Sequence, residues 1–143
     1  MMLVIMEEAT RLMDEVRLLM HAAVVFVEEL HADLDVSTPE RAVLEFLVRN
    51  GPTTVPDVAR ARGVSRQHIQ TIVNGLHDRE LVEPRRNPAH RRSSFVALAD
   101  DGRQLIDEML RREHDALDGR LAGIAAASML DAAAVLADIR TRL

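Results

Sequence analysis

The 143-residue sequence contains no cysteine, no lysine, no tryptophan and no tyrosine. The absence of cysteine excludes disulfides, thiol nucleophiles, cysteine-ligated zinc and thiol-based redox sensing. The only aromatic residues are Phe26, Phe46 and Phe95, so a core must be built from aliphatic side chains and methionine. No apolar run approaches the roughly 20 residues of a membrane span. The first six residues, MMLVIM, are too short and lack the basic start of a signal peptide. We therefore expect a cytoplasmic protein that does not enter a membrane.

Length and composition indicate one folded domain over residues 1–143. Apolar residues make up 48% of the chain and charged residues 29%, a balance typical of globular proteins rather than of disordered tails. Apolar residues recur at three- and four-residue steps over residues 7–34 and 104–143, with a break at Gly123. This period predicts long amphipathic helices at both ends of a mainly α-helical protein.

The central region, residues 37–98, has shorter elements. Cap and turn residues divide it into three short helices and then two short strands, at 81–86 and 94–98. Thr38 is the expected N-cap of the first short helix, with Pro39 at its first position. Ser65 is the expected N-cap of the third.

Charge is unevenly distributed along the chain, although the whole sequence has a net charge of −5. Residues 49–92 contain nine arginines against four carboxylates, a local charge of +5. The rest of the chain carries −10. The basic segment coincides with the short helices and the strands, and a basic module of this kind is typical of phosphate-binding surfaces.

The second and third short helices are separated by about three residues, a spacing that suits a DNA-binding helix-turn-helix. In the third helix Ile69, Ile72, Val73 and Leu76 share one face. The opposite side is polar and lacks acids before Asp78, which favours recognition of DNA over an ordinary solvated face. Gln and Asn can bond adenine at two positions, Thr can contact a thymine methyl and Arg can bond guanine or phosphate. The candidate DNA-contacting residues are Ser65, Arg66, Gln67, Gln70, Thr71 and Asn74; His68 and His77 flank them.

The loop between the two expected strands, residues 87–92, is also basic. Arg91 and Arg92 lie at its tip, and Arg85 and Arg86 at its base. A guanidinium on a thin hairpin can enter a narrow, electronegative minor groove. Taken alone, a solvated arginine loop would be the better interpretation. Because the hairpin directly follows a helix-turn-helix, we interpret it as a wing, with Arg86, Arg91 and Arg92 as contacts.

Taken together, the order of these segments resembles the MarR (multiple antibiotic resistance regulator) family of winged helix-turn-helix transcription factors. The similarity covers about residues 10–143, and it lies in the order of the elements rather than in one motif. The matching segments are STPERAVLEFL (37–47), GPTTVPDVA (51–59), GVSRQHIQTIVNGL (63–76), ELVEPRRNPAHRRSSFVAL (80–98) and DGR (101–103).

The resemblance implies a winged helix-turn-helix over residues 37–98 flanked by dimerisation helices over 7–34 and 100–143. It implies a homodimer that places residues 65–79 in the major groove and the wing arginines in the minor groove of a pseudo-palindromic operator in double-stranded DNA. It further implies a repressor that a small-molecule effector releases. The apolar stripes of the flanks independently favour a dimer, because a monomer would leave them exposed.

Two positions depart from the family pattern. An aspartate that braces an arginine often precedes the wing arginines, but His90 stands here, so the brace is either missing or replaced by Asn87. The family also favours threonine where this chain has Ala99, so Asp100 is the expected cap of the helix after the wing.

Ligand sites have weaker signals than the DNA-binding residues. If an effector binds between the dimerisation helices and the winged region, the residues expected to line that gap are Arg17, His21, Phe46 and Arg49. His31 with Asp35, and Glu113 with His114, offer only two metal ligands each, so we expect no metal and no cofactor.

No catalytic motif is present, and the six histidines are scattered, so we expect no enzyme. The remaining alternative to a regulator is a winged helix that binds protein partners and has lost DNA binding.

Overall fold

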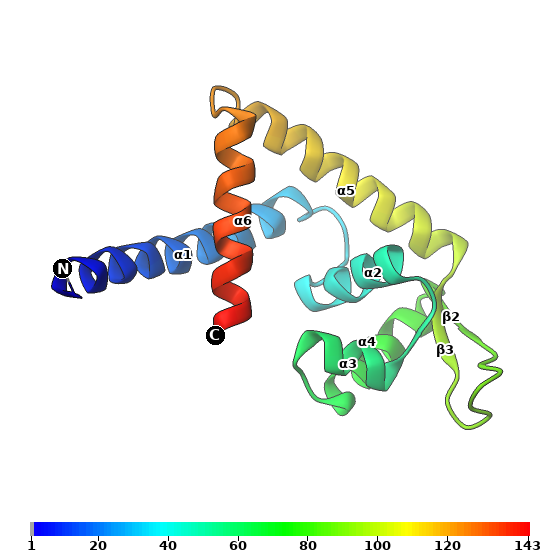
Figure 1. The fold of residues 1–143 in the computed structure, drawn as a ribbon. Helices are drawn as coiled ribbons and strands as arrows, with labels where there is room; N and C mark the ends of the chain where they lie inside the picture. Colours follow the sequence, from blue (N-terminus) through cyan, green and yellow to red (C-terminus); the bar gives the residue numbers. More distant parts are fainter. Residues whose placement is uncertain (1) are drawn as a thin grey trace. The chain divides into compact units, whose positions relative to one another are not determined.

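The computed structural model describes residues 2–143, with side chains from Met6 onward; most of the MMLVIM run therefore lies outside the described side chains. It confirms a mainly α-helical fold with a small β-sheet (Figure 1). The chain divides into two compact units, residues 1–111 and 112–143. The elements are α1 Met2–Leu30, α2 Thr38–Asn50, β1 Thr53–Thr54, α3 Val55–Arg62, α4 Arg66–Asp78, β2 Val82–Arg85, β3 Phe95–Leu98, α5 Asp100–Arg120 and α6 Ala126–Arg142.

The sheet has three antiparallel strands in the order β1-β3-β2. Two of them form the expected hairpin, in which Pro84 of β2 lies opposite Val96 of β3. Proline lacks the N–H that a central strand needs, and β2 lies at the sheet edge, where this absence is tolerated. The third strand, β1, was not predicted. Its Thr53 and Thr54 pair with Val96 and Phe95, and a strand of two residues is too short to show the alternation of apolar and polar side chains that predicts a strand.

The helices α2, α3 and α4 pack with the sheet and the start of α5 around one aliphatic core. In α4 the expected buried face is confirmed at Ile69, Val73 and Leu76, and Ile72 is half-buried against the same core. The largest fully buried side chains come from four helices and tie α4 rigidly to α2, α3 and α5. They are Val43, Leu44, Leu47, Val58, Ile69, Leu76, Ile106 and Met109.

The N-terminus of α2 corrects the sequence analysis. Ser37, rather than Thr38, is the N-cap. Its backbone N–H donates to the Glu40 carboxylate at 2.8 Å, and its hydroxyl accepts from the Glu40 N–H at 3.4 Å. This reciprocal capping box satisfies two helix-end donors, and it places Thr38 in the first turn. At α4 the expected cap is confirmed, because the Ser65 hydroxyl accepts from the His68 N–H at 3.1 Å.

The turn between α3 and α4 depends on Gly63, which adopts a left-handed conformation with φ 65° and ψ 32°. The Val64 N–H then donates back to the Ala59 carbonyl at 3.1 Å. A left-handed residue with this back-bond closes a helix end, and glycine is the residue that adopts it without strain.

The start of α5 also differs from the expectation. Asp100 does not cap the helix from outside, because α5 begins with Asp100 itself, and Ala99 precedes it. The Ala99 N–H instead donates to the Leu81 carbonyl at 3.1 Å. Asp100 and Asp101 occupy the first turn, where carboxylates interact favourably with the helix dipole.

The flanking helices leave much apolar surface uncovered. The described part of α1 exposes a series of large apolar side chains, although α1 ends at Leu30, earlier than the expected residue 34. In the second unit α6 buries no residue. The exposed side chains on these segments are Met6, Leu12, Leu18, Leu19, Met20, Val24, Val25, Leu117, Leu121, Ile124, Met129, Leu130, Val135, Leu136 and Leu143. Within residues 2–143 no helix is long and apolar enough to cross a membrane.

Candidate nucleic-acid interface

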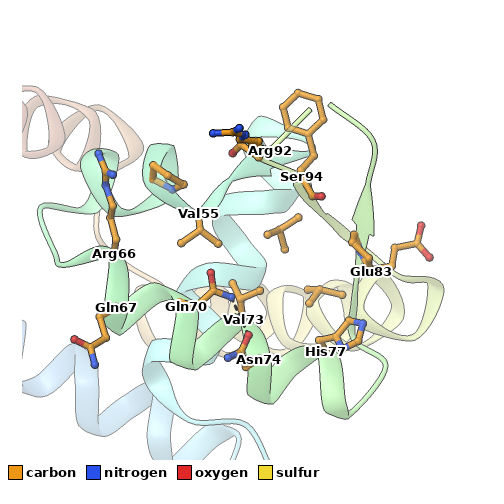
Figure 2. A pocket seen from close by; sticks show the side chains of 16 residues that line it. Val55, Arg66, Gln67, Gln70, Val73, Asn74, His77, Glu83, Arg92 and Ser94 are labelled. Carbon is orange, nitrogen blue, oxygen red and sulfur yellow. Dashed lines mark hydrogen bonds between the residues drawn. The ribbon is translucent and has the colours of Figure 1, made fainter. Parts of the chain in front are cut away.

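A cleft of about 600 Å³ lies between α4 and the hairpin. Figure 2 shows Arg66, Gln67, Gln70, Asn74 and His77 following one another along α4. On the hairpin side the cleft is lined by Glu83, Arg92 and Ser94, and its apolar lining includes Val55, Val73, Val82 and Val96. Helix and wing thus present polar side chains around one concave surface.

The arginines of the basic module fall into two groups. Arg60 pairs with Asp57 at 2.8 Å, and the Arg85 guanidinium donates to Glu83 at 3.2 Å. Arg66, Arg86, Arg91 and Arg92 are exposed and form no ion pair with a carboxylate in the described part of the chain. A guanidinium without a carboxylate partner can bind a phosphate without first breaking an ion pair. These four residues lie on α4 or the hairpin and are therefore well suited to contact a DNA backbone. Arg62, at the end of α3, is likewise exposed and has no carboxylate partner among the described residues.

Two side-chain amides on α4 are joined to each other. The Gln70 Nε2 donates to the Asn74 Oδ1 at 2.8 Å, one helical turn away. The bond uses one donor of Gln70 and one lone pair of Asn74, so the Gln70 carbonyl and the Asn74 NH₂ remain for base edges. Adenine presents one acceptor and one donor in the major groove, and an amide matches this pattern.

This bond gives a prediction for sequence reading. Gln70→Ala and Asn74→Ala should each weaken binding to a selected duplex, and together they should cost less than the sum, because each single change already breaks the pair. The effect on a scrambled duplex should be small, since amides read bases. Fluorescence anisotropy gives the affinity of the wild type, the two single variants and the double variant for each duplex. Strictly additive losses, or equal losses on both duplexes, would show that the pair does not read bases as a unit.

The remaining polar residues of α4 have local partners. The Thr71 hydroxyl donates to the Gln67 carbonyl at 3.0 Å, which keeps the side chain close to the helix. Thr71 is exposed but does not line the cleft. Ser65 is exposed at the N-terminus of α4 and caps it, and the N–H groups of such a terminus favour phosphate.

The wing loop is organised by Asn87. This side chain is buried, and its Oδ1 accepts from the Ala89 N–H at 3.0 Å, a local turn that asparagine forms readily. His90 follows and is exposed.

The pKa of Asp57, in the first turn of α3, is lowered from its usual value. The largest cause is the hydrogen bond from the Thr54 hydroxyl, at 2.7 Å, which outweighs the opposing effect of desolvation. The hydrogen bond and charge of Arg60, and last the charge of His90, lower it further. Asp57 therefore remains ionised at the start of α3.

The structure brings most predicted DNA contacts together but not all of them. Arg66, Gln67, Gln70, Asn74 and Arg92 line one cleft. Four predicted contacts lie outside its lining: Ser65, the N-cap of α4, Thr71 within α4, and Arg86 and Arg91 of the hairpin. The contacts of these residues with DNA stay predictions.

Four polar residues that line the cleft were not predicted as contacts: His77, Glu83, Ser93 and Ser94. His77 lies three residues after Asn74 and was considered only as a flanking residue, although its spacing placed it near the same face. Glu83 lies in β2, whereas Ser93 and Ser94 directly precede β3. No local pattern relates such hairpin positions to a helix face.

The residues predicted for an effector are spread over two helices. Arg17 and His21 are exposed on α1, where Arg17 pairs with Asp14 at 2.7 Å. On α2, Phe46 packs against the core and Arg49 is exposed beside Glu45. None of them lines a separate cavity of about 300 Å³ in the first unit. That cavity is lined by Val27, Glu28, His31, Ala32, Leu34, Val36, Ser37, Thr38, Pro39, Arg41 and Met109.

Metal binding has no geometric support in the described residues. Within the part of the chain that the structure describes, no three histidine or carboxylate side chains lie together so as to hold an ion. His31 is buried next to the smaller cavity, and Asp35 is exposed.

The central part of the chain is similar to a known protein family. The MarR family model matches residues 34–93. The uncharacterized protein Rv2011c of Mycobacterium tuberculosis is 37% identical over 75 residues, which cover 52% of this chain and 52% of the relative. The chain thus spans about half the length of the curated relatives with which it shares this identity.

Solved structures match over a longer range. The crystal structure of the MarR family transcription regulator SP03579 has a TM-score of 0.82 at 25% identity and covers 94% of this chain and 91% of that chain. BpsR of Bordetella bronchiseptica, whose DNA binding is regulated by 6-hydroxynicotinic acid, has a TM-score of 0.75 at 22% identity. That match covers 89% of this chain and 91% of BpsR, and it shows a shared fold.

Proposed function

We propose that this chain is a MarR family regulator that binds DNA in a sequence-specific way, because the family model matches residues 34–93 and a MarR family regulator shares the fold. In this proposal α4 reads the major groove, and Arg92, with Arg91 beside it, contacts the minor groove. The protein acts as a repressor until a small-molecule effector releases it.

The observation that carries the DNA-binding proposal is the cleft between α4 and the hairpin. One wall offers the joined amides Gln70 and Asn74, and the wing contributes Arg92, which has no carboxylate partner in the described chain. Amides read bases, and free guanidiniums bind phosphates or enter the minor groove. A protein-binding winged helix would have no need for this combination on one surface.

We further propose that the protein acts as a homodimer through its flanking helices. The exposed apolar side chains on α1 and α6 exceed what isolated surface residues account for. A second copy of the chain supplies the same apolar surface, and a twofold axis would set two α4 helices about 34–36 Å apart on DNA.

The dimer predicts a mass of twice the chain's 16.0 kDa in light scattering. Leu19→Asp or Leu130→Asp should shift the protein towards the monomer, because each puts a charge among exposed apolar side chains of α1 or α6. Val64→Asp is the matched control, since Val64 is exposed in the helix-turn-helix turn, outside these helices. A wild-type monomer, or equal mass for all three variants, would contradict the dimer.

For the effector we propose the cavity of about 300 Å³ beside the first turn of α2. Its lining includes His31 and Arg41, whose side chain pairs with Glu45 at 2.7 Å. The lining combines these basic groups with the Glu28 carboxylate, two hydroxyls and apolar side chains, a mixture that suits a small polar organic ligand. 6-Hydroxynicotinic acid, which regulates BpsR, is therefore a suitable first compound to test.

The experiment that tests the proposed function is a selection of genomic DNA fragments with the purified full-length protein. We expect recovery of a pseudo-palindromic motif whose half-sites lie about 10 base pairs apart, one helical turn. Recovery of fragments without a shared motif would contradict sequence-specific reading and would favour the protein-binding alternative.

A further inference from the structure

Arg79 connects the end of the recognition helix to a distant part of the chain. It directly follows Asp78, the last residue of α4. Its guanidinium donates to the backbone carbonyl of Asp35 and, at 3.4 Å, to the carboxylate of Glu40. The side chains of Arg79 and Glu40 are only 35% and 19% exposed, so solvent screens this contact less than a surface ion pair.

The Glu40 carboxylate has two functions at once. One oxygen accepts from the Ser37 N–H at 2.8 Å and from the Ser37 hydroxyl at 2.9 Å, which caps α2. The other oxygen accepts from Arg79. The same oxygen lies 3.7 Å from the position that a Cβ would take at Gly75 of α4. A single carboxylate therefore joins the first turn of α2 to the recognition helix.

The first turn of α2 also contacts α1. The Thr38 hydroxyl donates to Glu28 of α1 at 3.4 Å. Glu28, Ser37 and Thr38 all line the smaller cavity. This turn therefore lies between the cavity and α1 on one side and Arg79 on the other.

We infer that Arg79 is a positioning residue that transmits displacement of the first turn of α2 to the recognition helix. An occupant of the cavity that shifts this turn would move Glu40 and the Asp35 carbonyl, and α4 would follow through the guanidinium. The inference rests on the proposed function, since only DNA reading gives such a shift a consequence. Its physical basis is a contiguous chain of contacts from Glu28 through Thr38 and Glu40 to Arg79.

The test is a double-mutant cycle in the full-length protein. Thr38→Val removes the contact with α1 while nearly preserving shape, and Arg79→Ala removes the contact with α2. Arg142→Ala is the control, because it deletes an arginine from the exposed Arg142–Asp138 pair of α6. The readouts are the affinity for a duplex found in the genomic selection, the affinity for its scrambled version, and the melting temperature.

We expect Arg79→Ala to lower the affinity for the selected duplex about tenfold. Its affinity for the scrambled duplex should equal that of the Arg142→Ala control. Arg79→Lys should recover part of this loss, because an ammonium reaches one partner but lacks the fork that bonds both. Thr38→Val should change the affinity for the selected duplex about threefold in the wild-type background. In the Arg79→Ala background it should have no effect on that affinity.

Additive effects of the two changes, an unaffected Thr38→Val protein, or equal losses on both duplexes would overturn the inference. If the wild-type protein prefers no duplex, the proposed function fails, and hydrogen exchange then decides the role of Arg79. Arg79→Ala must speed amide exchange both in residues 35–40 and in the last turn of α4. Faster exchange in only one of these segments, or in neither, contradicts the coupling.

Discussion

Replacing both tip arginines, in an Arg91→Ala/Arg92→Ala variant, is expected to weaken DNA binding about 10- to 100-fold at physiological salt. The expected loss corresponds to one net charge-assisted hydrogen bond for the pair of arginines, about 1.5–3 kcal/mol, at about 1.4 kcal/mol per tenfold change in affinity. Both side chains are exposed and have no carboxylate partner in the described residues, so their removal costs the free protein no ion pair. The melting temperature should stay close to that of the wild type.

The salt dependence of the affinity shows whether Arg91 and Arg92 contact the DNA directly or act on binding indirectly. Each lost phosphate contact should reduce the slope of log affinity against log salt by about 1. Arg140→Ala/Arg142→Ala is the matched control, because it removes the same charge from the exposed end of α6. Anisotropy titrations at several salt concentrations give the slope. An affinity and slope equal to those of the control would rule out the wing as a DNA contact.

The largest expected loss of stability comes from Gly102→Ala in the first turn of α5. A Cβ built at Gly102 would lie 1.9 Å from the Leu81 carbonyl oxygen and 2.8 Å from its carbon. These are backbone atoms next to β2, so relief requires the helix and the strand to separate. Overpacking of this kind costs about 1–3 kcal/mol and occasionally more, and we expect the upper part of that range despite the higher helix propensity of alanine.

Gly119→Ala is the matched control for this substitution. Gly119 lies in the same helix, and a Cβ there would meet nothing within 4 Å. Alanine should therefore stabilise this position by up to about 1 kcal/mol through helix propensity alone. Thermal or urea unfolding of the two variants measures the difference. If Gly102→Ala were as stable as Gly119→Ala, the close approach of α5 to Leu81 would not exist in solution.

Local patterns in the sequence predicted the elements of the winged helix-turn-helix well. The spacing of Ile69, Val73 and Leu76 identified the buried face of α4, and Ser65 marked its start, because a three-to-four residue period and a cap act within one or two turns. The error at Ser37 was avoidable. Ser37 is followed three residues later by Glu40, which is the capping-box spacing, whereas Pro39 at the first helical position favours Thr38 as the cap.

The parts that sequence reasoning missed depend on distant residues. Arg79 contacts Asp35, 44 positions earlier, and no local pattern encodes that pairing. The two-residue strand β1 exists because β3 lies beside it. Glu83 and Ser94 reach the cleft only through the hairpin. The pattern within one helix does not show which residues of another helix lie beside it. The smaller cavity is formed where α1, α2 and Met109 of α5 meet, so its lining could not be predicted from either helix alone.

The most direct measurement is fluorescence anisotropy of a labelled duplex from the gene's own upstream region, against a scrambled duplex, at 50 and 200 mM salt. The account predicts tight binding to the first duplex and weak binding to the second. The affinity should fall steeply with salt, by about 10³–10⁵ for six to ten phosphate contacts. Equal, weak binding to both duplexes, repeated with the fragments recovered from the genome, would contradict the claim that the cleft between α4 and the hairpin reads DNA.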